Sequence, residues 1–240
     1  MTNQFLFIGL PYAALFVVLI GTIFRYLNFG FKVSSLSSQF LESKELFYGS
    51  RPFHWGLLFL FFGHLIAFLF PRSVMLWNSV PIRLIILEVS ALAFGITACY
   101  GLFVLILRRV RNPRLIKVAN KMDIVVYLVL TVQIATGLWV AVSFRWGSSW
   151  FASSLTPYIR SIFTFTPDIS AISSMPLAVK IHVVSAFTLI GIIPSTRFMH
   201  FLVYPFAYLW RSYQLVIWNW DPKKIRTSRK LFNGVRSRNN

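Results

Sequence analysis

Five long apolar stretches constrain what this chain can fold into. They lie at about residues 5–24, 52–70, 82–107, 124–142 and 177–209. Each is long enough to supply the roughly 20 residues with which an α-helix crosses the hydrocarbon core of a bilayer. Because lipid offers no hydrogen bonds to the backbone, such stretches become helices. The sequence therefore predicts an all-α membrane protein with five transmembrane helices.

The composition supports a single membrane bundle. Of the 240 residues, 57% are hydrophobic and only 12% are charged, which is too few charges for the surface of a soluble domain. We expect a transmembrane domain over residues 1–210 and a basic cytoplasmic tail over residues 211–240.

The distribution of positive charge predicts the orientation. The gaps at 25–51 and 108–121, together with the tail, hold 18 Lys and Arg residues, whereas the gaps at 71–83 and 143–180 hold five. Basic residues accumulate on the cytoplasmic side of membrane proteins. We therefore expect the N-terminus outside and the C-terminus inside, in the cytoplasmic (inner) membrane. The net charge of +18 is then a consequence of how the chain is oriented in the membrane. We expect membrane lipid as a partner and no nucleic acid.

The four histidines of the chain all lie within apolar stretches, His54 and His64 in the second and His182 and His200 in the fifth. An imidazole in hydrocarbon is costly and usually functional. Because the two stretches run in opposite directions, matching their depths pairs His54 with His200 and His64 with His182. We interpret each pair as the axial ligands of one haem iron, which gives two haems stacked across the bilayer.

The spacings fit this pairing only approximately. At about 1.5 Å per residue, ten helical residues span roughly 15 Å and eighteen span roughly 27 Å. We expect helix tilt and a kink at Pro194 to absorb the difference. On one continuous helix, His182 and His200 would lie on the same stripe, five turns apart.

Other roles are open to the histidines. A single membrane histidine often only hydrogen-bonds a neighbouring helix. This explanation is less convincing when it must apply to all four histidines of the chain. Met175 or Met199 could replace one ligand, but the pairing leaves no histidine without a partner. Zinc is disfavoured, since no Cys, Asp or Glu completes a tetrahedral set. The single cysteine, Cys99, excludes an internal disulfide and a Cys₄ cluster.

Several neighbours of the histidines are candidate contacts. Gly56 and Gly63 remove side-chain bulk where a flat porphyrin must approach, although helix packing explains membrane glycines equally well. The charge of Arg197, three residues before His200, could be met by a haem propionate or by lipid headgroups, and we favour the propionate. Arg25 and Arg109 are interpreted as topology signals. Residues 143–176, rich in serine and aromatics, predict a headgroup-level surface or a short interfacial helix.

The histidine stretches resemble one known family. The similarity lies in the runs Phe53-His54-Trp55-Gly56 to Gly63-His64, Lys180-Ile181-His182 to Thr196-Arg197-Phe198-Met199-His200, Arg25-Tyr26-Leu27, Ser37-Ser38-Gln39-Phe40-Leu41-Glu42 and Tyr213-Gln214-Leu215-Val216. On these runs the chain resembles the gamma subunit of membrane-bound respiratory nitrate reductase, up to about residue 216.

The resemblance implies a function. It implies a di-haem cytochrome b that oxidises quinol near the outer haem (His64, His182) and passes electrons to the inner haem (His54, His200). It further implies that the electrons leave for an iron–sulfur beta subunit and a molybdenum alpha subunit on the cytoplasmic side. In this reading the chain is one subunit of an oxidoreductase complex that reduces nitrate.

One departure from the family concerns the quinol site. The family carries a lysine early in the third helix, whereas this chain has Arg83 and Glu88 in that region and no lysine. The quinol-site candidates are therefore Gly63, His64, Arg83 and Glu88, with Glu88 as a proton acceptor. A complex running in reverse, from nitrite oxidation to quinone, fits the sequence equally well.

Two further functions compete with this reading. The chain could be a haem-bearing anchor without a quinone site, or a transporter without haem that uses Arg197 and Glu88. Reduction by quinol analogues separates the first from an electron-transfer subunit. The absence of a Soret band would favour the second.

Overall fold

The structure, a computed structural model, describes residues 2–29, 38, 41–42 and 44–203. Within these residues five helical spans are long and apolar enough to cross a membrane, namely Thr2–Phe29, Lys44–Leu69, Pro81–Arg111, Lys121–Ser143 and Leu177–Ser195. The predicted fold class and number of spans are confirmed. The predicted tail at 211–240 and the end of the fifth stretch, 204–209, lie outside the described residues.

The described elements are mostly helical. In order they are α1 (Thr2–Gln4), the π-helical turn η1 (Phe5–Gly9), α2 (Leu10–Phe29), α3 (Lys44–Leu69), α4 (Pro71–Asn78), α5 (Pro81–Arg111), α6 (Pro113–Lys117), α7 (Lys121–Ser143), α8 (Gly147–Trp150), the π-helical turn η3 (Phe151–Leu155), α9 (Thr156–Phe163), α10 (Ser170–Ser174), α11 (Leu177–Ile192), the 3₁₀ turn η4 (Ile193–Ser195) and α12 (Met199–Val203).

The start of α3 differs from the prediction. The second apolar stretch predicts a helix from about residue 52, but the helix begins at Lys44 and Pro52 lies inside it. The reason lies before the helix, where the carboxylate of Glu42 accepts hydrogen bonds from the backbone N–H groups of Glu45 (2.7 Å) and Leu46 (3.1 Å). These amides have no partner within the helix, so the cap moves its start two turns upstream. Pro71 begins α4, which follows the second span.

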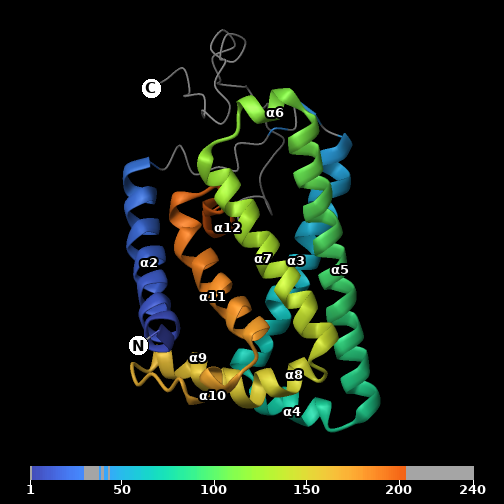
Figure 1. The fold of residues 1–240 in the computed structure, drawn as a ribbon, viewed down its shortest axis with the longest axis vertical. Helices are drawn as coiled ribbons and strands as arrows, with labels where there is room; N and C mark the ends of the chain where they lie inside the picture. Colours follow the sequence, from blue (N-terminus) through green and yellow to red (C-terminus); the bar gives the residue numbers. More distant parts are fainter. Residues whose placement is uncertain (1, 30–37, 39–40, 43, 204–240) are drawn as a thin grey trace.

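The bundle has two distinct ends (Figure 1). The helix α6 lies at one end with the basic residues Arg108, Arg109, Arg111, Arg114, Lys117 and Lys121, and we call this the basic end. The short helices α4, α8, α9 and α10 lie across the opposite end, which we call the capped end. They include the residues expected to form an interfacial helix, and that local prediction of helix is confirmed.

A buried aromatic cluster ties the capped end to the first span. Phe7 and Tyr158 are both 1% exposed, and the Tyr158 hydroxyl donates a hydrogen bond of 2.8 Å to the carbonyl of Phe7. Burial raises the pKa of the Tyr158 phenol, which keeps it protonated as a donor. The π-helical turn η1 thus has a partner for one of its carbonyls in α9.

The long helices pack in a defined order. α3 packs mainly against α5, whereas α11 packs against α7 and α2. Close packing of α3 on α5 depends on Gly101, since a Cβ there would overlap the backbone of Phe53. Among the described elements, α3 and α11 are not in extensive backbone contact. These are the two helices that carry the histidines.

The fifth span is broken, contrary to the predicted continuous helix through His200. α11 ends at Ile192, a 3₁₀ turn follows, and Thr196 is fully extended (φ −121°, ψ 178°) before α12 begins at Met199. Pro194 has no N–H to continue the helical hydrogen bonds. The expected kink is therefore a complete interruption, and the argument that placed His182 and His200 on one helical stripe is wrong.

Candidate functional site

The structure brings the four histidines together as two pairs. The ring centroids of His54 and His200 are 6.4 Å apart, and those of His64 and His182 are 6.5 Å apart. The first pair joins α3 to α12 and the second joins α3 to α11. Matching the histidines by depth therefore predicts the neighbouring pairs. The expected single helical stripe that carries both His182 and His200 is wrong.

The broken span removes the mismatch in rise. On the continuous helix α3, the ten residues from His54 to His64 correspond to about 15 Å. As one helix, the eighteen residues from His182 to His200 would span roughly 27 Å, which is longer than the distance between the two histidines of α3. Because the chain leaves the helix between Ile192 and Met199, both pairs can meet.

The ring separations are those that a shared metal requires. A metal–imidazole bond is about 2 Å long, so two imidazoles that bind one metal from opposite sides have ring centres roughly 6 Å apart. A direct hydrogen bond between the two rings would bring them closer. Both pairs therefore fit a metal held between two imidazoles.

Hydrogen bonds at Nδ1 orient all four rings. The acceptors are the carbonyls of Ser50 for His54 (2.7 Å), Leu60 for His64 (2.7 Å), Gln133 for His182 (3.0 Å) and Arg197 for His200 (2.6 Å). A carbonyl can only accept, so each Nδ1 carries the proton and each Nε2 keeps its lone pair. This is the usual arrangement of a metal-binding histidine.

Two imidazoles alone do not complete a coordination sphere. Within the described part of the chain, no group of three or more His, Cys, Asp or Glu side chains could hold a metal ion. A haem brings its own ring nitrogens and asks the protein only for axial ligands such as histidine. The donor set therefore fits a haem at each pair and does not fit a metal bound by protein ligands alone.

The His64–His182 pair is supported from α7, which sequence reasoning did not identify. Gln133 accepts from Nδ1 of His182 with its carbonyl, and its side-chain amide lies 3.1 Å from Nε2. The Ser185 hydroxyl donates to the Gln133 side-chain carbonyl. A Cβ on Gly137 would lie 2.9 Å from the His182 ring, so only glycine leaves room for this imidazole. The four-residue step from Gln133 to Gly137 was the available signal.

The His54–His200 pair is supported by charged groups at the basic end. Arg197 forms an ion pair with Asp123 (3.0 Å) and donates to the carbonyl of Val118 (3.1 Å). Asp123 also pairs with Arg109 at 3.5 Å. The Asp123 carboxylate is thus one partner of Arg197, and the contact of Arg197 with a haem propionate stays a prediction.

The two glycines beside the α3 histidines differ. A Cβ on Gly56 would lie 2.7 Å from backbone atoms of Phe94 and Ala98. Its missing side chain therefore makes room for α5, as the helix-packing alternative predicts. Gly63 has nothing within 4 Å of its Cβ position, and its predicted role stays a prediction.

The other quinol-site candidates lie near the capped end. Glu88 accepts hydrogen bonds from the backbone N–H (2.9 Å) and hydroxyl (2.6 Å) of Ser148. Three residues further on, the Phe151 ring contacts His64 with centroids 5.3 Å apart. The segment 148–151 thus links Glu88 to the His64–His182 pair. Arg83 is exposed, with its guanidinium 5.2 Å from the centre of the Trp77 ring, and is not part of this link.

Fold and site define the class of the protein. It is a multi-pass helical membrane protein in which two antiparallel spans present paired imidazoles at two depths. A profile described as "Nitrate reductase gamma subunit" matches residues 3–219. The chain belongs to this family, which confirms the resemblance drawn from the histidine stretches and the assignment to an oxidoreductase subunit.

Individual relatives agree with the family. The chain is 35% identical over 219 residues to the nitrate reductase gamma chain of Bacillus subtilis, covering 89% of this chain and 97% of the relative. It is 30% identical over 217 residues to the respiratory nitrate reductase 1 gamma chain of Escherichia coli, covering 89% and 96%. It is also 29% identical to the nitrate reductase-like protein NarX of Mycobacterium tuberculosis, of which it covers 33%.

Proposed function

We propose that this chain is the membrane electron-transfer subunit of a nitrate reductase and that it holds two b-type haems between α3 and α11–α12. His64 and His182 would bind one haem, and His54 and His200 the other. The observation that carries the proposal is the pair of ring separations, 6.4 and 6.5 Å, together with four Nδ1 hydrogen bonds that leave each Nε2 unprotonated, with the Gln133 side-chain amide 3.1 Å from Nε2 of His182.

Bound haem would supply one-electron redox chemistry at a potential tuned by its surroundings. The chain's own contribution is to fix the imidazoles. α3 carries His54 and His64 on one rigid helix, which holds the two sites about 15 Å apart along its axis. This spacing gives a path for electrons along the bundle.

The positive charge of the basic end orients this path. Six basic residues lie between positions 108 and 121 with no acidic residue before Asp123. By the positive-inside rule the basic end faces the cytoplasm and the capped end faces outward, in the cytoplasmic membrane. The His64–His182 site is then the outer site, and the His54–His200 site is the inner one.

Quinol would be oxidised beside the outer site. Gly63 leaves open space next to His64, and Glu88 lies nearby with its Oε1 engaged by Ser148. Oε2 of Glu88 would accept a proton released from quinol at the outer face. Electrons would leave at the basic end for the iron–sulfur and molybdenum subunits of the complex.

Stopped-flow reduction by a quinol analogue tests the proposal in membranes that contain the complete complex. We expect both b-type centres to be reduced, with the His64–His182 centre reduced even when His200→Ala has removed the other. A chain whose haems stay oxidised would be an anchor without a quinone site and would contradict the proposal. A complex that reduces quinone with electrons from nitrite would reverse the direction proposed.

A further inference from the structure

The break in the fifth span raises the question of what positions His200. α12 has only five residues, Met199–Val203, and it does not continue α11. An isolated helix of this length is not stable by itself. Tertiary contacts of residues 194–199 must therefore hold His200 opposite His54.

One side of the break is held by α2. A Cβ on Gly21 would lie 2.9 Å from the Pro194 ring, so glycine lets the break approach this helix. One turn later, Arg25 donates hydrogen bonds to the carbonyls of Pro194 and of Thr196, the latter at 2.9 Å. These are carbonyls that lose their helical partners at the break. Arg25 thus has a structural role beyond a topology signal.

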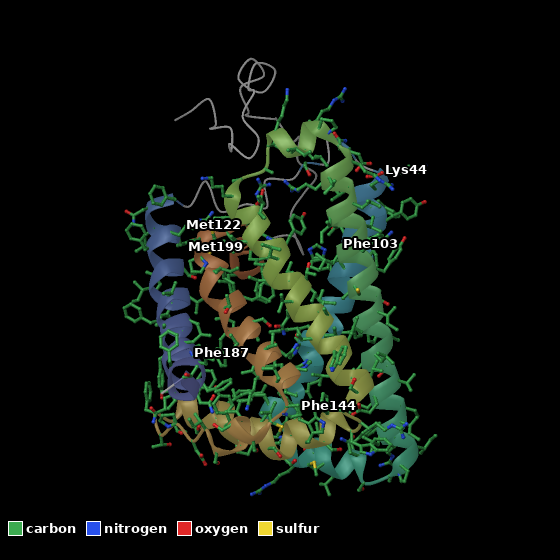
Figure 2. All side chains as sticks on the ribbon, viewed as in Figure 1. Lys44, Phe103, Met122, Phe144, Phe187 and Met199 are labelled. Carbon is green, nitrogen blue, oxygen red and sulfur yellow. The ribbon has the colours of Figure 1, made fainter. Side chains whose placement is uncertain are left out.

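The other side is held by the start of α7. Oδ1 of Asp123 pairs with Nε of Arg197 at 3.0 Å, and the Asp123 side chain is only 9% exposed. The carbonyl of this same Arg197 accepts the Nδ1 hydrogen bond of His200 at 2.6 Å. Between them, Met199 is fully buried, and Figure 2 shows it level with Met122, the neighbour of Asp123.

We propose that Asp123 is a positioning residue for the His54–His200 haem. By holding Arg197, it fixes the carbonyl that orients the His200 imidazole, and no comparable charged group supports His182 among the described contacts. This inference rests on the proposed function, since it concerns how the chain holds a haem. It assigns Asp123 a role in one of the two sites only.

The test compares the two haems within one molecule. Asp123→Asn keeps the shape of the side chain but removes the charge that holds Arg197. Loss of such a supporting contact typically costs about 10-fold to 100-fold in metal affinity. In purified complex with excess apomyoglobin as haem acceptor, we expect roughly tenfold faster loss of the His54–His200 haem and an unchanged rate for the other. The spectra of His200→Ala and His182→Ala identify each centre.

Matched variants separate positioning from helix capping. The Asn120 side chain accepts from the N–H of Asp123 at 2.7 Å, and Asp123 accepts in return from the N–H of Asn120 at 3.1 Å. Asn120→Ala removes the first of these bonds and leaves Arg197 untouched, so we expect normal haem retention. Asp123→Glu, which restores the charge, should recover most of the retention.

Three results would overturn the inference. These are unchanged retention in Asp123→Asn, equal loss of both haems from a chain of normal abundance, and an equal effect of Asn120→Ala. If Asp123→Asn lowers the abundance of the chain, Arg25→Gln decides the matter, because it loosens the same break from α2 and should also affect only the His54–His200 haem. A wild-type chain without any haem would instead overturn the proposed function.

Discussion

The two histidine pairs have the same ring separation but are supported in different ways. His64 and His182 both lie within continuous helices, and α7 supports them with the uncharged groups of Gln133 and Gly137. His54 faces His200, which follows a break and depends on Arg197 and Asp123. Packing and uncharged hydrogen bonds thus position the imidazole at one site, whereas an ion pair positions it at the other. The difference predicts that the two sites respond to different substitutions.

The largest expected effect is the complete loss of one centre. His182→Ala should abolish the same b-type spectrum that His64→Ala abolishes, and His200→Ala the same as His54→Ala, because each proposed haem would then be held by one histidine in place of two. The measurement is the reduced-minus-oxidised visible spectrum of each variant. If His64→Ala and His200→Ala removed the same centre, the pairing would be wrong.

Gly137→Ala should act next most strongly, and only on the His64–His182 site. The added methyl would lie 2.9 Å from the His182 ring, and overpacking of this kind costs about 1–3 kcal/mol. We expect most of this haem to be lost while the other is retained, as measured by haem per chain. Gly191→Ala on α11 is the matched control, because its Cβ would make an ordinary contact of 3.4 Å with Ala14. Equal loss of both haems in Gly137→Ala would contradict the local role of this residue.

Glu88→Gln should slow quinol oxidation without changing either haem. The amide keeps an oxygen that can accept from Ser148, so the link to segment 148–151 persists, but it cannot take up a proton. The measurement is the rate of haem reduction by quinol at fixed pH, with the haem spectra as the control for folding. Unchanged turnover would remove Glu88 from the quinol site.

The smallest effect concerns acidity at the basic end. Burial alone would raise the pKa of Glu42, but hydrogen bonds from Arg108 and from the N–H groups of Glu45 and Leu46 outweigh it and lower the pKa. The folded pKa is below the unfolded one, so this stabilisation is present above the unfolded pKa and is lost as the pH falls through the folded pKa. Lowering the pH from about 7 to about 3 should loosen residues 44–46 more than residues 156–160, as measured by their protection from hydrogen exchange, and Glu42→Gln should remove the difference.

The sequence predicts the spans and the neighbouring histidines because both follow from hydrophobicity and chain direction. The length of about 20 apolar residues is a strong signal, and opposite directions allow only one pairing by depth. Helix ends are less predictable, since the start of α3 depends on a cap from Glu42 and the end of α11 on contacts with Arg25.

The supporting residues could not be predicted in the same way. Gln133, Gly137 and Asp123 lie on α7, which carries no histidine, and only the packing of α7 against α11 brings Gln133 and Gly137 to His182. Gly56 shows the converse, because its proximity to His54 in the sequence suggested a haem contact although its Cβ position faces α5. Residues that are close in sequence on one helix can face different neighbours. Proximity to a histidine in the sequence is therefore a poor guide to membership of its site.

The most direct measurement is haem counted per chain with a redox-titrated visible spectrum of the purified complex. Paired imidazoles at two depths predict two b-type haems per chain with separate midpoint potentials, because one site is lined by uncharged groups and the other by an Arg–Asp pair. A single haem per chain, or a preparation without a Soret band, would contradict the account.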